Sequence, residues 1–121
     1  MNLIYIHPRC SSCKKALAWL DAQGIDYQTK SLLESSPTES ELRTMLDAYA
    51  GEVRRLFNTS GNAYRESGLK DRLPAMPQSE AIELLRSDGM LVKRPFILSE
   101  SGNLVGFREP AWKEKFAPSQ P

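Results

Sequence analysis

The order of apolar and polar positions predicts a strand, a helix and a second strand in the N-terminal part of the chain. Leu3–Ile6 is a continuous apolar run that ends at His7, as expected of a buried strand. From Ser11 onward, apolar residues recur at helical spacing, and Gly24 follows as a stop signal. Residues 25–29 then alternate apolar and polar, which predicts a half-buried strand that a right-handed crossover would place parallel to the first.

The middle of the chain has the pattern of helices. The Ser-Pro-Thr-Glu sequence at 36–39 is interpreted as a capping box with proline at the first helical position, opening a helix that ends near Gly51. Short helices are predicted at residues 53–57 and 62–66, and a further helix at 79–86.

The C-terminal part returns to strands. Residues 95–98 and 103–107 are predicted as strands on either side of a Glu-Ser-Gly turn, and residues 110–116 as a last helix. The resulting order, β-α-β, helical insertion and β-β-α, predicts an α/β fold.

The 121 residues show no linker long enough to divide the chain. We therefore expect a single domain over residues 1–117, with the helical insertion at about residues 36–90. The tail at 118–121, rich in Pro, Ser and Gln, is expected to be disordered.

Composition and charge narrow the classes of function. The chain has 16 basic and 15 acidic residues, and a net charge of +1 gives no electrostatic reason to bind nucleic acid or an acidic membrane. Its apolar runs are far shorter than the roughly 20 residues of a membrane helix, and residues 1–6 lack the features of a signal peptide. We expect a cytoplasmic monomer with no membrane partner and no direct nucleic-acid partner.

The chain has two cysteines, Cys10 and Cys13, and enough apolar content to fold without a disulfide. This usage favours reduced, reactive or metal-binding thiols over a secreted disulfide scaffold. A zinc site needs four ligands, whereas the chain offers the two cysteines and His7, so we expect no metal site. Two inert buried cysteines remain the alternative to reactive ones. His7 either tunes a thiolate or serves as a structural hydrogen-bond partner.

The Cys-Ser-Ser-Cys sequence lies between a predicted buried strand and a predicted helix, which favours thiol-disulfide exchange. Free amides and the dipole at a helix N-terminus stabilise a thiolate, so Cys10 is the expected nucleophile. Cys13 follows one turn later on the inward helix face and is the expected resolving thiol. Arg9 adds positive charge beside the pair, and Ser11 and Ser12 keep the first turn polar. These three residues are candidates for substrate binding.

The cysteine pair and three later segments together resemble the motifs of a known family. The segments are 57–61 (Phe-Asn-Thr-Ser-Gly), 64–69 (Tyr-Arg-Glu-Ser-Gly-Leu) and 88–95 (Asp-Gly-Met-Leu-Val-Lys-Arg-Pro). With them the chain resembles the arsenate-reductase-like (ArsC/Spx) family, specifically its small Spx-like reductase branch, over nearly its whole length. The resemblance implies a thioredoxin-like fold with a helical insertion and a cis peptide bond before Pro95 that faces the cysteines. It also implies an external thiol donor, such as glutathione or thioredoxin, and no bound cofactor.

The resemblance implies roles for further residues. Arsenate reductases of this family hold the oxyanion with three arginines, and Arg94 occupies one of these positions, where it would stabilise the thiolate or an anionic substrate. Asn58, a candidate substrate-binding residue, and Phe107 occupy the other two positions. Arg108, one residue further on, is a candidate replacement, as are Arg54, Arg55 and Arg65. Pro95 is expected to shape the substrate groove.

Three hypotheses of function follow. The first is a thiol-disulfide oxidoreductase in which Cys10 attacks and Cys13 resolves. The second, from the regulator branch of the family, is an Spx-type redox switch that binds the RNA polymerase α subunit. The third is an arsenate reductase that uses arginines displaced from the family positions.

Overall fold

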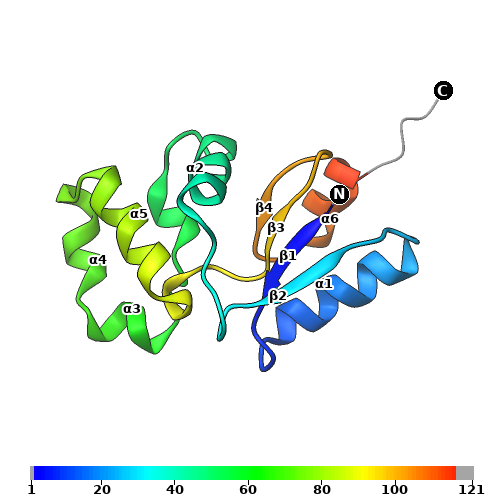
Figure 1. The fold of residues 1–121 in the computed structure, drawn as a ribbon, viewed down its shortest axis with the longest axis horizontal. Coiled ribbons are helices and arrows are strands. Elements are labelled where there is room, and N and C mark those ends of the chain that lie inside the picture. Colours follow the sequence, from blue (N-terminus) through cyan, green and yellow to red (C-terminus); the bar gives the residue numbers. More distant parts are fainter. Residues whose placement is uncertain (1, 117–121) are drawn as a thin grey trace.

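A four-stranded mixed sheet forms the centre of the fold in the computed structural model, which describes residues 2–116 (Figure 1). The strand order is β2-β1-β3-β4. β1 (Leu3–Ile6) pairs in parallel with β2 (Gln28–Ser31) and antiparallel with β3 (Phe96–Leu98). β3 also pairs antiparallel with β4 (Leu104–Val105). The parallel pairing of the first two strands is as predicted from the sequence.

Helices occupy the chain on either side of these strands. The α-helices are α1 (Ser11–Ala22), α2 (Glu39–Ala48), α3 (Asn62–Glu66), α4 (Leu69–Arg72), α5 (Gln78–Ser87) and α6 (Glu109–Phe116). The 3₁₀ turns are η1 (Val53–Leu56), η2 (Leu73–Ala75) and η3 (Gly89–Leu91). α2 to α5 and all three turns lie between β2 and β3, as the predicted helical insertion requires. No helix in the described part of the chain is long and apolar enough to span a membrane.

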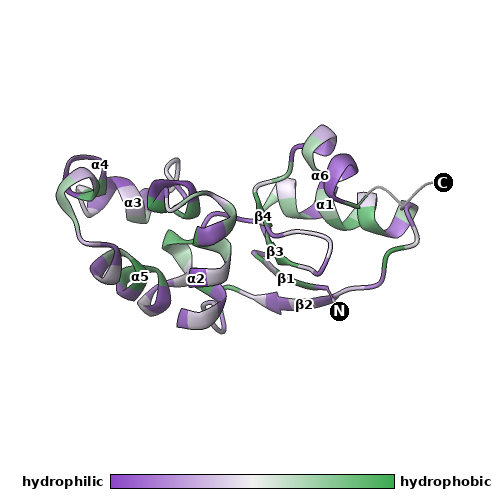
Figure 2. Ribbon diagram, turned by 90° about the horizontal axis from the view of Figure 1, so that it is seen from above, coloured by the Kyte–Doolittle hydropathy of each residue, from purple (hydrophilic) through white to green (hydrophobic). Residues whose placement is uncertain are grey.

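The two faces of the sheet are covered by different helices, because side chains alternate between faces along each strand. On one face, Ile4, Ile97 and Leu104 pack against α1 and α6, which lie together over that side of the sheet (Figure 2). On the other face, Tyr5 and Phe96 join the core of the helices between β2 and β3, with ring centroids 5.8 Å apart. The sheet therefore separates two apolar clusters.

The start of α2 differs from the sequence prediction. Thr38, rather than Ser36, is the N-cap: its Oγ1 accepts a hydrogen bond from the Glu41 backbone N–H at 3.1 Å, and Glu41 accepts one from the Thr38 N–H at 2.9 Å. Both Ser36 and Thr38 have a glutamate three residues later, so the pattern alone fits either. Glu41 also accepts a hydrogen bond from the Tyr5 hydroxyl at 2.6 Å, a tertiary contact that fixes it at the start of α2.

The second strand begins later than predicted, at Gln28 instead of residue 25. Ile25 and Tyr27 are half-buried against the α1 side of the sheet but lie outside the strand ladder. Pairing begins where the Gln28 N–H donates to the Asn2 carbonyl at 2.8 Å. β2 is an edge strand with mostly exposed side chains. Its pairing with β1, rather than the alternation of apolar and polar residues in its sequence, therefore decides where it begins and ends.

Other boundaries shift for local reasons. β4 ends at Val105, short of the predicted 107, because Gly106 has a φ of +71° that leaves the extended conformation. The sequence prediction missed α4 and η2, which follow Gly68 in the left-handed conformation at φ +66°. The predicted disordered tail at 118–121 lies outside the described residues.

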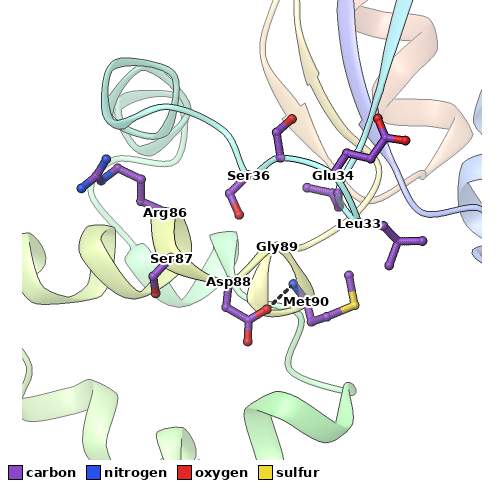
Figure 3. Close-up of a pocket in the computed structure, with 10 residues that line it drawn as sticks. Leu33, Glu34, Ser36, Arg86, Ser87, Asp88, Gly89 and Met90 are labelled. Atoms are coloured by element: carbon purple, nitrogen blue, oxygen red, sulfur yellow. Dashed lines mark hydrogen bonds between the residues drawn. The ribbon is translucent and has the colours of Figure 1, made fainter.

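Two connecting segments, on either side of the helical part, meet at Gly89. A Cβ atom on Gly89 would lie 2.3 Å from the Leu32 carbonyl oxygen, so only glycine permits this approach. Residues 32–36 and 86–90 line a surface pocket of about 330 Å³ around this contact (Figure 3). The contact holds the segment that leads to Pro95 against the segment that leaves β2.

Candidate active site around Cys10 and Cys13

Cys10 is the N-cap residue of α1. Its backbone is extended, with φ −92° and ψ 113°, and its Sγ accepts a hydrogen bond from the Cys13 backbone N–H at 3.1 Å. The Cys10 N–H donates to the His7 carbonyl at 3.1 Å, which anchors the turn between β1 and α1. The thiol is half-buried and free. The Cys10 sulfur therefore lies at the start of α1, in contact with a backbone N–H of the first turn.

Cys13 is buried on the inward face of α1, with 1% of its surface exposed, as the sequence predicted. Burial, the largest cause, together with a hydrogen bond with the Cys10 side chain and the charge of Cys10, raises the pKa of its thiol to about 12. A hydrogen bond from the His7 backbone and the charge of Arg94 act in the opposite direction. Cys13 is therefore a neutral thiol next to Cys10 at physiological pH.

Arg94 places a guanidinium beside the cysteine pair. It lowers the pKa of Cys13 and of His7, so its charge lies close to both groups. Its Nη1 is buried and has no hydrogen-bond partner among residues 2–116. An unpaired buried donor is costly in free energy, and an anion at this position would satisfy it. The peptide bond from Arg94 to the buried Pro95 is cis, as the family resemblance implied.

His7 is held as a neutral hydrogen-bond acceptor. Its Nδ1 accepts a hydrogen bond from the Arg9 backbone N–H at 3.0 Å. Burial lowers the pKa of His7, and the charges of Arg94 and Arg9 lower it further. Of the two roles left open for His7 by the sequence, this geometry favours the structural one, because a neutral imidazole adds no positive charge beside a thiolate.

The remaining candidate residues come from two segments. Ser11 is exposed and Ser12 is half-buried in the first turn of α1, and Arg9 is exposed in the turn before it. Asn58 is half-buried, and its backbone N–H donates to the Leu91 carbonyl at 2.7 Å. This bond ties the loop of Asn58 to the segment that leads to Arg94 and Pro95. Contact of these side chains with a substrate stays a prediction.

Phe107 belongs to an aromatic cluster rather than to a polar pocket. Its ring centroid lies 5.1 Å from that of Trp112 and 6.4 Å from that of Trp19. Arg108 is exposed next to it, at the start of α6. An apolar side chain therefore fits position 107, where the resemblance implied an arginine in arsenate reductases of the family. Lys93, which the sequence prediction did not single out, lines a pocket together with Arg54 and Arg55.

The described residues contain no group of three or more His, Cys, Asp and Glu side chains that could hold a metal ion.

The sequence pattern of the ArsC family matches residues 5–115. The chain belongs to the ArsC family. The uncharacterised protein YusI of Bacillus subtilis is 38% identical to this ArsC chain over 113 residues, covering 93% of the chain and 96% of YusI. The solution structure of SACOL0876 from Staphylococcus aureus has a TM-score of 0.84 at 39% identity, covering 96% of the chain and 98% of that protein.

A regulator is also among the relatives of this ArsC chain. The global transcriptional regulator Spx 2 of Bacillus cereus is 28% identical over 118 residues, covering 98% of the chain and 88% of the regulator. These relatives and the mixed sheet confirm two expectations from the sequence, an ArsC/Spx family and a thioredoxin-like α/β fold. They place the chain in a redox family.

Proposed function

We propose that this ArsC-family protein is a thiol-disulfide oxidoreductase that uses Cys10 as nucleophile and Cys13 as resolving thiol. The observation that carries the proposal is the asymmetry of the pair. The half-buried Cys10 sulfur accepts the Cys13 N–H at 3.1 Å at the start of α1, whereas Cys13 is buried and protonated. A nucleophile needs access and a thiolate, and a resolving thiol needs protection from other reagents.

The proposed reaction has two steps. In the first, the Cys10 thiolate attacks one sulfur of a disulfide substrate, so that a mixed disulfide forms and the other substrate sulfur leaves as a thiolate. In the second, Cys13 loses its proton and attacks the Cys10 sulfur, which releases the remaining substrate thiol and leaves a Cys10–Cys13 disulfide. Two electrons from an external thiol donor, such as glutathione or thioredoxin, then restore both thiols.

The causes of the raised Cys13 pKa explain why Cys13 loses its proton only after Cys10 has formed the mixed disulfide. The hydrogen bond with Cys10 and the charge of Cys10 both raise the pKa of Cys13 in the reduced protein. Once the Cys10 sulfur is in a mixed disulfide, its charge is gone, whereas the positive charge of Arg94 remains. Cys13 is then more acidic than in the resting protein, so its proton is lost more readily at the step that needs the thiolate.

Arg94 and Pro95 have supporting roles in the proposal. The unpaired Nη1 of Arg94 would donate a hydrogen bond to the thiolate or to an anionic substrate. Pro95 shapes the groove, and Arg9, Ser11, Ser12 and Asn58 lie at positions where they would contact the substrate. The proposed compartment is the cytoplasm, where thiols are kept reduced.

Single cysteine variants test the proposal in a thiol-coupled assay with a disulfide substrate. Cys10→Ser should abolish turnover, because no other exposed sulfur can attack. Cys13→Ser should accumulate the mixed disulfide, detected by intact mass, because the resolving thiol is absent. Ser101→Ala, in the exposed hairpin turn, is the matched control and should keep full activity. Equal turnover in the unmodified protein and Cys10→Ser would refute the proposal.

A second candidate function is a redox switch that binds the RNA polymerase α subunit. The similarity to Spx 2 over 98% of the chain favours it. In this function the Cys10–Cys13 disulfide would change binding without turnover. A pull-down with the purified α subunit should then capture the protein in one redox state only, whereas Cys10→Ser, which cannot form the disulfide, should behave the same under both conditions. Equal capture, or none, under oxidising and reducing conditions would count against a switch.

Arsenate reduction is the third candidate. The unpaired donor of Arg94 favours an oxyanion, whereas the aromatic packing of Phe107 leaves that family arginine position apolar. Arsenate-dependent oxidation of a thiol donor by the purified protein measures this activity. We expect it to be much slower than disulfide reduction, and a comparable rate would make arsenate the better candidate substrate.

A further inference from the structure

A small basic pocket lies at the junction between the helical part and the sheet. It has a volume of about 180 Å³ and is lined by Arg54, Arg55, Phe57, Thr59 and Lys93. Phe57 is buried, Thr59 and Lys93 are half-buried, and both arginines are exposed. The pocket therefore combines a buried apolar residue, a hydroxyl group and three cationic side chains.

The backbone of the pocket is held together by hydrogen bonds. Residue Phe57 forms an antiparallel bridge with Val92, and the Lys93 N–H donates to the Leu56 carbonyl at 2.8 Å. The Asn58 N–H donates to the Leu91 carbonyl at 2.7 Å. These bonds join the segment that carries Thr59 to the segment that carries Lys93, so the two sides of the pocket do not depend on a ligand for their position.

The position of Arg55 is also set by packing. Its guanidinium carbon lies 4.7 Å from the centroid of the Tyr49 ring, a cation-π contact. The Tyr49 hydroxyl in turn accepts a hydrogen bond from the Val105 N–H at 3.0 Å, which ties this ring to β4. Because the guanidinium is held over a fixed ring, less conformational entropy is lost when it binds an anion.

The three cations of the pocket lack carboxylate partners. Among residues 2–116, no Asp or Glu side chain forms an ion pair with Arg54, Arg55 or Lys93. Arg65, by contrast, donates to Asn62 and lies outside the pocket. Three like charges around one small cavity repel each other, and a bound anion would remove this repulsion.

Lys93 of the pocket and Cys10 both lie close in sequence to strand ends that lie together at one end of the sheet. β3 is antiparallel to both β1 and β4, so the end of β1, the start of β3 and the end of β4 lie side by side at one end of the sheet. Cys10 follows β1 and Lys93 precedes β3, while Gly106 follows β4 and its N–H donates to the Pro95 carbonyl at 2.8 Å.

We propose that Arg54, Arg55, Thr59 and Lys93 form a binding site for a carboxylate or phosphate group. If the oxidoreductase function proposed above holds, this site is where the carboxylate of a small anionic thiol docks while its sulfur reaches Cys10. The two sources of the anion, a thiol co-substrate and a free oxyanion, share the chemistry of recognition: guanidinium and ammonium donors around a compact negative group.

Binding of inorganic phosphate tests the site without any reaction. In ¹⁵N-labelled protein, phosphate should shift the amide signals of Thr59 and Lys93 in a saturable manner. The double variant Arg55→Gln/Lys93→Gln should raise the dissociation constant of phosphate by about tenfold, since it removes two of three charge-assisted contacts. Lys113→Gln/Lys115→Gln, on α6, is the matched loss of two charges elsewhere and should leave binding unchanged. An absence of saturable shifts, or equal weakening by Lys113→Gln/Lys115→Gln, would overturn the proposal.

Two further variants keep the test valid if the double variant does not fold. Lys93→Arg keeps the charge and should retain phosphate binding. If the double variant fails to fold, Arg54→Gln takes its place in the titration. It changes an exposed side chain and should weaken phosphate binding. Undiminished binding in Arg54→Gln and in a folded double variant would also overturn the site.

Reduction of the Cys10–Cys13 disulfide distinguishes the two sources of the anion. With glutathione, which carries carboxylates, the double variant should have a KM raised by about tenfold, while the rate with neutral 2-mercaptoethanol stays the same. An unchanged KM for glutathione in a double variant that binds phosphate more weakly assigns the site to a free oxyanion. If neither thiol reduces the disulfide, the oxidoreductase function fails, and the phosphate titration still decides whether the site exists.

Discussion

The raised pKa of Cys13 predicts that the two cysteines differ sharply in reactivity toward iodoacetamide. Alkylation needs a thiolate. At pH 8 a thiol with the ordinary pKa of 9.0 is about one-tenth ionised, whereas one with a pKa of about 12 is ionised in about one molecule in ten thousand. Cys13 should therefore react about a thousandfold more slowly than an ordinary thiol. Its burial, with 1% exposure, slows the reaction further.

Mass spectrometry measures this difference directly. Reduced native protein at pH 8 should gain one alkyl group quickly and a second only after denaturant is added. Cleavage after Arg9 and Lys14 gives one peptide with both cysteines, and fragmentation of this peptide identifies the modified one. Unfolded protein, in which both thiols are exposed, is the control and should gain two groups at similar rates.

The cysteine variants separate the causes of the raised pKa. In Cys10→Ser the charge of Cys10 is gone, but burial, the largest cause of the raised Cys13 pKa, remains. Cys13 should then react faster than in the unmodified protein and still far more slowly than Cys10 does in Cys13→Ser. If Cys10→Ser and Cys13→Ser are alkylated at the same rate in the native state, the inferred asymmetry of the pair is wrong.

Three further predictions concern the fold and the surroundings of the site. Gly89→Ala should lower the free energy of unfolding by about 1–3 kcal/mol in urea, because its Cβ would lie 2.3 Å from the Leu32 carbonyl oxygen; unchanged stability would contradict this contact. Thr38→Ala should cost about 1 kcal/mol and Ser36→Ala less, since Thr38 is the observed cap; the reverse order would restore the cap predicted from the sequence. NMR titration of the single histidine should give a pKa below 6.5 that rises in Arg94→Gln, and equal values would place Arg94 away from His7. The unfolded state binds this proton more readily, so His7 should lower stability as the pH falls below 6.5.

The sequence predicted those parts of the site that depend on local geometry. An apolar run that ends before Cys-x-x-Cys, followed by helical spacing, was enough to place Cys10 at the N-cap of α1 and Cys13 on its inward face. A separation of three residues on a helix is one turn wherever the helix lies, so no knowledge of distant contacts is needed.

Element boundaries were less predictable, because they depend on partners far away in the chain. β2 starts at Gln28 since its pairing with β1 decides where an exposed edge strand begins. Thr38 rather than Ser36 caps α2, and its partner Glu41 is also held by Tyr5 of β1. Two positions that match one capping pattern cannot be told apart by spacing alone.

The sequence by itself determined the order of the elements, which member of the cysteine pair is the more buried and, through its motifs, the family. Only the tertiary structure brought Arg54 and Arg55 into one pocket with Lys93, and it alone gave the direction in which Arg94 shifts the pKa of Cys13. The physical reason is the separation along the chain over which each effect acts. Hydrophobic periodicity and helix capping act over one or two turns, whereas pKa shifts and binding pockets depend on charges and desolvation from segments that meet only when the chain folds.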